Sequence, residues 1–294
     1  METTFDRGDM RRTVMRYKII GDSCLDLTAE LKNDPRFQII PLTLQVDDHM
    51  VIDDETFNQK KFLELVKASP NCPKTACPSP EAFRDAYGSD AEWIFVITLS
   101  SHLSGTYNSA VLGQSLYEEE NGAKHILVID SESASSGELN IAFKLMELCE
   151  QDLTFEQVSE QILKFRDEQK TYFILESLDT LRKNGRLTGL QAFFATALNI
   201  KPVMGAQKGI IVKLEQARGI GKGLARMCDL AVKDASNAVS GKRVVIAHCN
   251  NPDRARATKA ELEKRASFKE IIITETAGVA TVYANDGGII LGVG

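Results

Sequence analysis

The chain has 294 residues, of which 43% are hydrophobic and 26% charged, and these proportions are typical of a globular protein. Its formal net charge is −6, which argues against nucleic acid or an anionic membrane as a general partner, because both need a basic surface. No run of 18 apolar residues occurs, so the sequence predicts no membrane-spanning helix and no integral membrane protein.

The first sixteen residues are polar and charged and lack the apolar stretch of a secretory signal. We interpret residues 1–16 as a loose N-terminal extension. The six cysteines are scattered, with no C-x-x-C pair and no zinc-like grouping with the histidines. We therefore expect a cytoplasmic protein with reduced thiols and without a bound metal.

In the first half of the chain, short apolar runs alternate with amphipathic segments. Continuously apolar runs are typical of strands covered on both faces, and they predict strands at residues 17–20, 37–44, 93–99 and 125–130. Apolar residues recur at helical spacing over residues 138–149 and 155–165. This alternation implies βαβ crossovers, so a mainly parallel, doubly wound sheet is predicted here.

The second half has a less regular order of elements. Strands are predicted at residues 171–175, 210–216, 243–248, 270–274 and 287–293, and helices at residues 190–199, 222–235 and 253–265. At this length we expect two domains rather than one. The sequence predicts an α/β protein whose first domain spans residues 17–155. A second α/β domain, with a mixed sheet and helices, spans residues 156–294.

Small hydroxyl side chains collect after the predicted strands. The segments concerned are "DSCLDLT" after the first strand, "SSHLSGT" after the third, "DSESASSGE" after the fourth and the loop "TACPSP". Helix capping explains one hydroxyl in each segment but not three or four. Because ligands bind at the carboxyl ends of parallel strands, these segments predict a site for an anionic oxygen group. No Lys or Arg lies inside them, which favours a single carboxyl or an acyl phosphate held by neutral donors.

Two enzyme motifs are absent. The segment "ARGIGKGLA" lacks the spacing of a phosphate-binding P-loop, and "SHLSG" lacks the first glycine of a hydrolase nucleophile elbow. A phosphotransfer-type or other small-ligand enzyme on a related α/β fold remains the alternative, and a non-lipid binding protein is a third hypothesis. The phosphotransfer enzyme would need an exposed histidine, for which His102 and His248 are the candidates. We interpret these as a loop residue and a hydrogen-bonded strand-end residue.

An ordered set of segments resembles the DegV family of bacterial fatty-acid-binding proteins over about residues 17–294. "GDSCLDL" resembles the family's D-S-x-x-D-L, "TACPSP" its T-S-Q-P-S loop, and "LSSHLSGTYNSA" its L-S-S-x-L-S-G-T-Y-x-S-A. "LRKNGRL" is similar to L-x-K-G-G-R-I, with Asn184 in place of a glycine. "LNIKPV", "AHCNNPDRA" and "YANDGG" also match. Each motif alone is weak, but the ordered set is specific.

The resemblance implies two α/β domains with a fatty acid buried between or within them. It implies that the carboxyl is held by Thr75 and Ser104, with Ser101 nearby. It further implies a non-catalytic carrier, without a cofactor, that presents the acid to a partner kinase subunit for acyl-phosphate formation. Tyr283 stands where some members place a head-group histidine, and Ala76 replaces a serine donor.

Two further sets of residues follow from the resemblance and from the sequence. A basic stretch that the family associates with kinase function matches Arg218 and Lys222, which are therefore candidates for partner contact. The acyl tail needs apolar residues, for which the second domain offers Phe193, Phe194 and Leu198.

Overall fold

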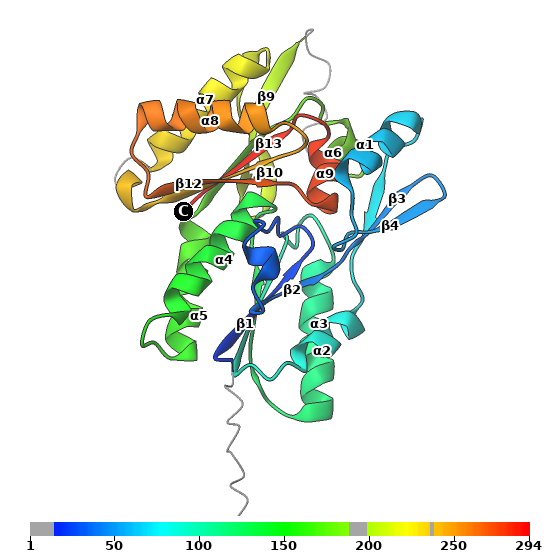
Figure 1. The fold of residues 1–294 in the computed structure, drawn as a ribbon, viewed down its shortest axis with the longest axis vertical. Coiled ribbons are helices and arrows are strands. Elements are labelled where there is room, and N and C mark those ends of the chain that lie inside the picture. The colour runs from blue at the N-terminus through cyan, green and yellow to red at the C-terminus, as the bar shows by residue number, and fades with distance from the viewer. Residues whose placement is uncertain (1–14, 188–198, 236–237) are drawn as a thin grey trace, which may run out of the picture.

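The computed structural model describes residues 15–187, 199–235 and 238–294 (Figure 1). Its first half contains a four-stranded sheet in which every neighbouring pair is parallel. The strand order is β2 (Phe37–Ile40), β1 (Tyr17–Asp22), β6 (Trp93–Thr98) and β7 (His125–Asp130). The parallel sheet predicted for the first half is thereby confirmed.

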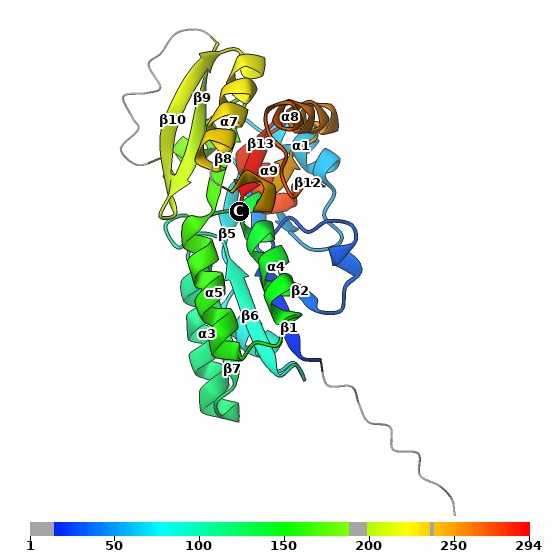
Figure 2. The same cartoon turned by 90° about the vertical axis from the view of Figure 1, so that its left-hand side faces the viewer.

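Helices cover both faces of this sheet (Figure 2). Side chains alternate between the faces along each strand, so Ile19 and Phe95 join one apolar core while Ile20 and Val96 join the other. The first core is completed by α4 (Ser136–Cys149) and α5 (Phe155–Glu168), and the second by α2 (Pro80–Tyr87) and α3 (Thr106–Asn121). The doubly wound arrangement explains why these strands are apolar throughout.

The second half contains a six-stranded mixed sheet, as predicted. Its order is β10 (Ile210–Arg218), β9 (Ile200–Gln207), β8 (Lys170–Ile174), β13 (Ile289–Val293), β11 (Arg243–His248) and β12 (Glu270–Glu275). The pair β11–β12 is parallel and the other pairs are antiparallel. Two helices, α7 (Ile220–Ala235) and α8 (Pro252–Arg265), pack on it and share its apolar core.

A small antiparallel sheet lies beside the main body, with the order β4 (His49–Ile52), β3 (Thr43–Val46) and β5 (Lys74–Ala76). The single strand predicted over residues 37–44 is wrong, because the chain leaves the parallel sheet after Ile40 and enters this sheet at Thr43. Pro41 lies at the break and has no N–H to donate to a ladder. The helices α1 (Gln59–Ala68), α6 (Asp179–Lys183) and α9 (Gly278–Ala284) lie close by (Figure 1). Single 3₁₀ turns occur at Leu31–Asn33 and Val239–Gly241.

The end of the predicted extension is held in place. Residues 1–14 and the predicted helix 190–199, apart from Asn199, lie outside the described residues. The guanidinium of Arg16 donates to the carbonyl oxygens of Cys149, Gln151 and Leu153 at 2.8–3.0 Å and stacks on Trp93. Arg16 is therefore not part of a loose segment. The boundary between residues 155 and 156 stays a prediction, because α4 packs on both large sheets.

Candidate functional site

A pocket of about 830 Å³, including its open mouth, lies between the carboxyl edge of the parallel sheet and the mixed sheet. Most of its wall is apolar and comes from both halves of the chain, including Leu42, Leu99, Leu103, Phe173, Leu175, Leu181, Ile211, Val279 and Ile290. The carboxyl edge of a parallel sheet is the place where α/β proteins bind ligands, as the sequence predicted.

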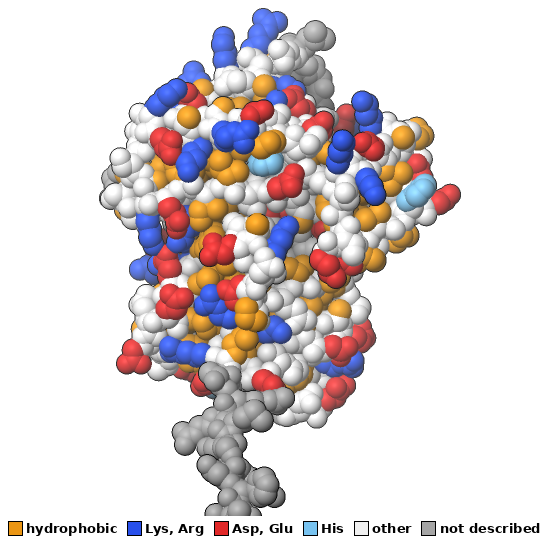
Figure 3. Space-filling model, viewed as in Figure 1, with side chains coloured by type: hydrophobic (Ala, Val, Ile, Leu, Met, Phe, Trp, Pro, Cys, Tyr) orange, Lys and Arg blue, Asp and Glu red, His pale blue; other side chains and the backbone are white. Residues whose placement is uncertain are grey.

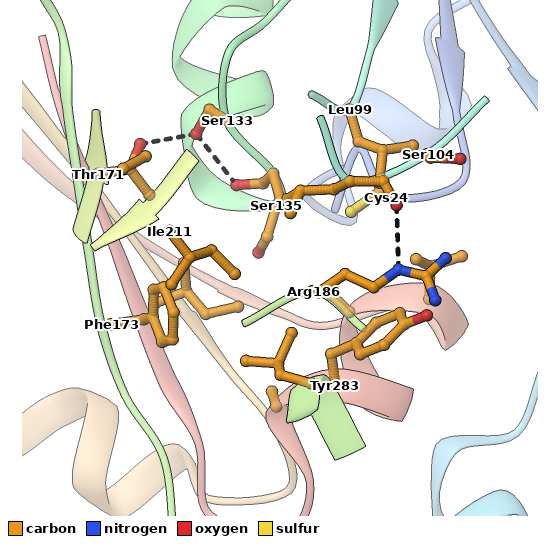
Figure 4. A pocket seen from close by; sticks show the side chains of 18 of the residues that line it. Cys24, Leu99, Ser104, Ser133, Ser135, Thr171, Phe173, Arg186, Ile211 and Tyr283 are labelled. Atoms are coloured by element: carbon orange, nitrogen blue, oxygen red, sulfur yellow. Dashed lines mark hydrogen bonds between the residues drawn. The ribbon is translucent and has the colours of Figure 1, made fainter. Parts of the chain in front are cut away.

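One end of the pocket is polar (Figure 4). Thr75 of β5 and Tyr283 of α9 meet there, with 3.0 Å between the two hydroxyl oxygens. Ser104, in the loop before α3, lines the same end, and its hydroxyl lies 2.9 Å from that of Thr106. Thr75, Ser104 and Tyr283 are half-buried, so their hydroxyls can meet both a ligand and water.

Arg186 completes this end, and the turn after α6 places it there. Gly185 has φ +76°, and the N–H groups of Gly185 and Arg186 donate to the carbonyls of Arg182 and Leu181. This pair of bonds is a Schellman motif, which ends a helix through a residue in the left-handed region. Asn184 ties the turn to the segment before β5, since its side chain donates to the Pro73 carbonyl at 2.8 Å.

The guanidinium of Arg186 retains capacity for a ligand. Its Nε donates to the Leu103 carbonyl at 3.1 Å and its Nη1 to the Asn184 carbonyl at 2.5 Å. The group lies 5.7 Å from the centre of the Tyr283 ring. Within residues 15–187, 199–235 and 238–294, no carboxylate forms an ion pair with it. A positive charge therefore lies among the neutral donors, which the sequence did not predict.

The opposite end of the pocket is mostly apolar (Figure 4). Phe173 of β8 and Ile211 of β10 lie there, away from Ser104 and Arg186. The hydroxyls of Ser133 and Thr171 also reach this end, but they lie 2.6 Å apart and bond to each other. Ser133, Thr171 and Ile211 are buried, so this end is shut off from water more completely than the polar end.

Most of the hydroxyl residues that the sequence singled out form hydrogen bonds within the protein. Ser101 does not line the pocket, and its N–H donates to the Asp130 carboxylate at 3.1 Å. Ser135 begins α4 in a capping box with Glu138, and its hydroxyl donates to Asp26 at 2.5 Å. The segments "DSCLDLT" and "DSESASSGE" therefore stabilise the fold more than they present donors to a ligand.

Four carboxyl groups, Asp22, Asp26, Asp53 and Glu138, are buried behind the pocket, and we call them the carboxylate cluster. Burial raises the pKa of Asp22 and of Asp26 to about 7 and that of Asp53 to about 6. Ligand atoms of Asp22, Cys24 and Glu138 lie within 4.8 Å of one another. Both oxygens of Asp22 already accept backbone N–H groups, from Cys24 and Leu99, and we assign no metal there.

The remaining predicted residues lie away from the pocket. Arg218 ends β10 and Lys222 lies in the first turn of α7, and both are exposed. The predicted tail-pocket residues Phe193, Phe194 and Leu198 lie outside the described residues. The described part of the tail wall includes Leu42 and Leu99, so the first half of the chain contributes to it as well.

Neither histidine considered for an enzyme lines the pocket. His102 is exposed in the loop after β6. His248 is buried at the end of β11, where its Nδ1 accepts the Asn251 N–H at 3.3 Å and burial lowers its pKa. Sequence reasoning missed Arg186 as a site residue, although the glycine in "LRKNGRL" signalled the turn that places it.

Two surface features bear on possible partners. Basic and acidic side chains are interspersed on the face drawn in Figure 3, and no large basic patch is seen there. No helix in the described segments is long and apolar enough to cross a membrane.

Comparisons with known proteins identify the family. The model of the family described as "Uncharacterised protein, DegV family" matches residues 16–293. A DegV domain-containing protein of Streptococcus pneumoniae is 35% identical over 283 residues, which is 95% of this chain and 99% of that protein.

Solved structures agree with this match. A DegV-family protein from Ruminococcus gnavus, described with vaccenic acid, has a TM-score of 0.92 and 48% identity, covering 95% of this chain and 99% of that one. The Streptococcus pneumoniae fatty acid kinase B3 protein loaded with linoleic acid has a TM-score of 0.85, 34% identity and the same coverage. This chain belongs to the DegV family.

Proposed function

We propose that the protein binds a long-chain fatty acid, with the acyl tail in the pocket and the carboxyl at its polar end. The observation that carries this proposal is the distribution of polarity. An apolar cavity with a guanidinium and hydroxyls at one end fits a long apolar chain that ends in one anionic group. The fatty acids described with the Ruminococcus gnavus and Streptococcus pneumoniae relatives support the same class of ligand.

The expected energetics agree with tight binding. Each buried methylene contributes about 0.8 kcal/mol, so a tail of sixteen carbons contributes about 12 kcal/mol before costs. Loss of translational and rotational freedom takes several kcal/mol of this. The carboxylate loses part of its hydration, and the charge of Arg186 offsets that cost better than neutral donors do.

We further propose that this protein is a carrier and not itself a catalyst. The carboxyl would lie at the half-buried end, where a phosphoryl donor on a partner kinase could reach it. The name of the Streptococcus pneumoniae fatty acid kinase B3 protein supports such a partner. We also propose that the protein works in the cytoplasm, where free thiols such as its six cysteines persist.

Replacement of the two head-end hydroxyls tests the ligand site. Ser104→Ala and Thr75→Val each remove a hydroxyl, and each is expected to weaken binding of vaccenic acid by about 1–3 kcal/mol, or roughly 5- to 150-fold. Circular dichroism and melting temperature should stay near wild type, since both side chains are half-buried. Unchanged affinity in a folded double variant would show that these two residues do not bind the carboxyl.

A second experiment addresses the kinase partner. Arg218→Ala is expected to leave fatty-acid affinity nearly intact and to lower acyl-phosphate formation when a cognate kinase is supplied, because exposed charges orient protein partners. Lys222→Ala should act in the same direction. Lys233→Ala, an exposed change near the other end of α7, is the matched control. Full turnover with Arg218→Ala would place kinase contact elsewhere.

A further inference from the structure

Helix α9 forms one wall of the pocket and carries Tyr283 to its polar end. The start of this helix is held by two carboxylates from the first sixty residues of the chain. Asp26 accepts the N–H of Ala277 at 2.6 Å. The two oxygens of Asp53 accept the N–H groups of Gly278 and Val279 at 2.6 and 2.8 Å.

These contacts are close-fitting as well as polar. Gly278 has no side chain, and a Cβ built on it would lie 2.5 Å from Oδ1 of Asp53, which is closer than Cβ contacts allow. Both carboxyl groups are buried, Asp26 with 1% and Asp53 with 3% of its surface exposed. The three backbone N–H groups lie only 2.6–2.8 Å from the carboxyl oxygens, so these hydrogen bonds fix the start of α9.

The segment around α9 has further support from α1. Nε2 of Gln59 lies 2.8 Å from the Thr276 carbonyl and 3.2 Å from the Thr281 hydroxyl. The result is a short helix from the second half of the chain whose place is set largely by residues of the first half. Along the same helix, Val279, Ala280, Tyr283 and Ala284 face the pocket.

We infer that Asp26 and Asp53 are positioning residues for the fatty-acid site, which act by holding α9 so that Tyr283 meets Thr75. This inference rests on the proposed function. The two residues touch no ligand, and their effect passes through α9. A displacement of α9 by about one ångström would break the 3.0 Å contact between Tyr283 and Thr75 and open the apolar wall.

The test follows release of bound vaccenic acid from the full chain. Asp53→Ala is expected to release the acid at least about tenfold faster, because one carboxylate that fixes α9 is gone. Asp53→Asn keeps one acceptor oxygen, so its release rate should lie between those of Asp53→Ala and wild type. Asp54→Ala is the matched control, since the carboxylate of Asp54 is exposed and bonds to Thr56. Its release rate should stay within about twofold of the wild-type rate.

Gly278→Ala disturbs the same contact from the side of α9, because the new methyl group would lie 2.5 Å from Oδ1 of Asp53, and it would also lie 2.6 Å from Cδ1 of Leu44. It should also speed release, and the effect of the double variant Asp53→Ala/Gly278→Ala should be smaller than the sum of the two single effects, because both variants disturb the contact with Asp53. Additive effects would mean two unrelated lesions and would overturn the inference. Unchanged release from folded Asp53→Ala would overturn it as well.

A second readout reports the position of Tyr283 without any ligand. The protein is labelled with 3-fluorotyrosine, and the ¹⁹F signal of residue 283 is assigned with Tyr283→Phe. The signal should shift in Asp53→Ala and Asp53→Asn but not in Asp54→Ala. A signal that does not move contradicts the inference, whatever happens to release. Failure of wild type to bind any fatty acid would instead refute the proposed function, and the ¹⁹F result would still decide the role of Asp53.

Discussion

The polar end of the pocket and the carboxylate cluster lie at the same edge of the parallel sheet, yet they use polar groups in opposite ways. In the cluster, both oxygens of Asp22, of Asp26 and of Asp53 and one oxygen of Glu138 accept hydrogen bonds from the protein itself. At the polar end, the guanidinium of Arg186 donates to two carbonyls and has no carboxylate partner among the described residues.

The difference shows that residue type alone does not mark a binding site. A polar group whose hydrogen bonds are complete stabilises the fold, whereas one with spare donors beside a cavity can bind a ligand. The two regions are also connected, because Asp26 and Asp53 hold the helix that carries Tyr283. The three predictions below perturb one region at a time.

The largest effect is expected in the cluster, on the pH dependence of stability. Burial raises the folded-state pKa of Asp22 from 3.8 to about 7, so the folded protein binds a proton that the unfolded chain has released. The contribution of Asp22 to the free energy of unfolding is therefore largest below about pH 4 and is lost as pH rises towards 7.

Asp22→Asn removes this titration and loses one of the two acceptors for backbone N–H groups. We expect the stability difference between wild type and Asp22→Asn to move in favour of the variant by a few kcal/mol between about pH 4 and pH 8. Urea unfolding at several pH values measures it. Parallel stability curves for the two proteins would show that Asp22 does not titrate in this range.

The second effect is expected at the polar end. Arg186→Ala should weaken binding of vaccenic acid by roughly 1.5–3 kcal/mol, because a hydrogen bond to a charged group is lost. Arg186→Lys keeps the charge but not the planar donor group, so its affinity should lie between those of wild type and Arg186→Ala. Lys183→Ala, an exposed change in the same short helix, serves as the control for isothermal titration. Equal affinities for Arg186→Ala and Lys183→Ala would exclude Arg186 from the head-group site.

The smallest effect is expected at the opposite, mostly apolar end of the pocket. Phe173→Ala should shift the preference towards longer acids, since each further buried methylene contributes about 0.8 kcal/mol. Competition between acids of different length measures the shift against wild type. An unchanged order of preference would place the end of the tail elsewhere.

The sequence predicted the central architecture well where strands are buried on both faces. β7 and β11 have the predicted limits, because their apolar runs are continuous and end at polar residues. The short strands β4 and β5 were not predicted. They have three or four residues each, and all of those residues are exposed or half-buried.

The site was harder to predict than the fold, because it depends on contacts distant in sequence. Thr75 and Ser104 line the pocket as the resemblance implied, but their role in binding stays a prediction. The bond between Thr75 and Tyr283 joins residues 208 positions apart, and the contact of Asp53 with Gly278 joins residues 225 positions apart. No local pattern reports which of many hydroxyls and carboxylates are already hydrogen-bonded.

Mass spectrometry of an organic extract of the purified protein tests the central claim most directly. The account predicts a long-chain fatty acid at close to one molecule per protein chain in wild type. It also predicts a clear loss of that acid in the folded variant Arg186→Ala/Ser104→Ala. Purified wild type that carries no fatty acid, and that takes up none when vaccenic acid is supplied, would contradict the account.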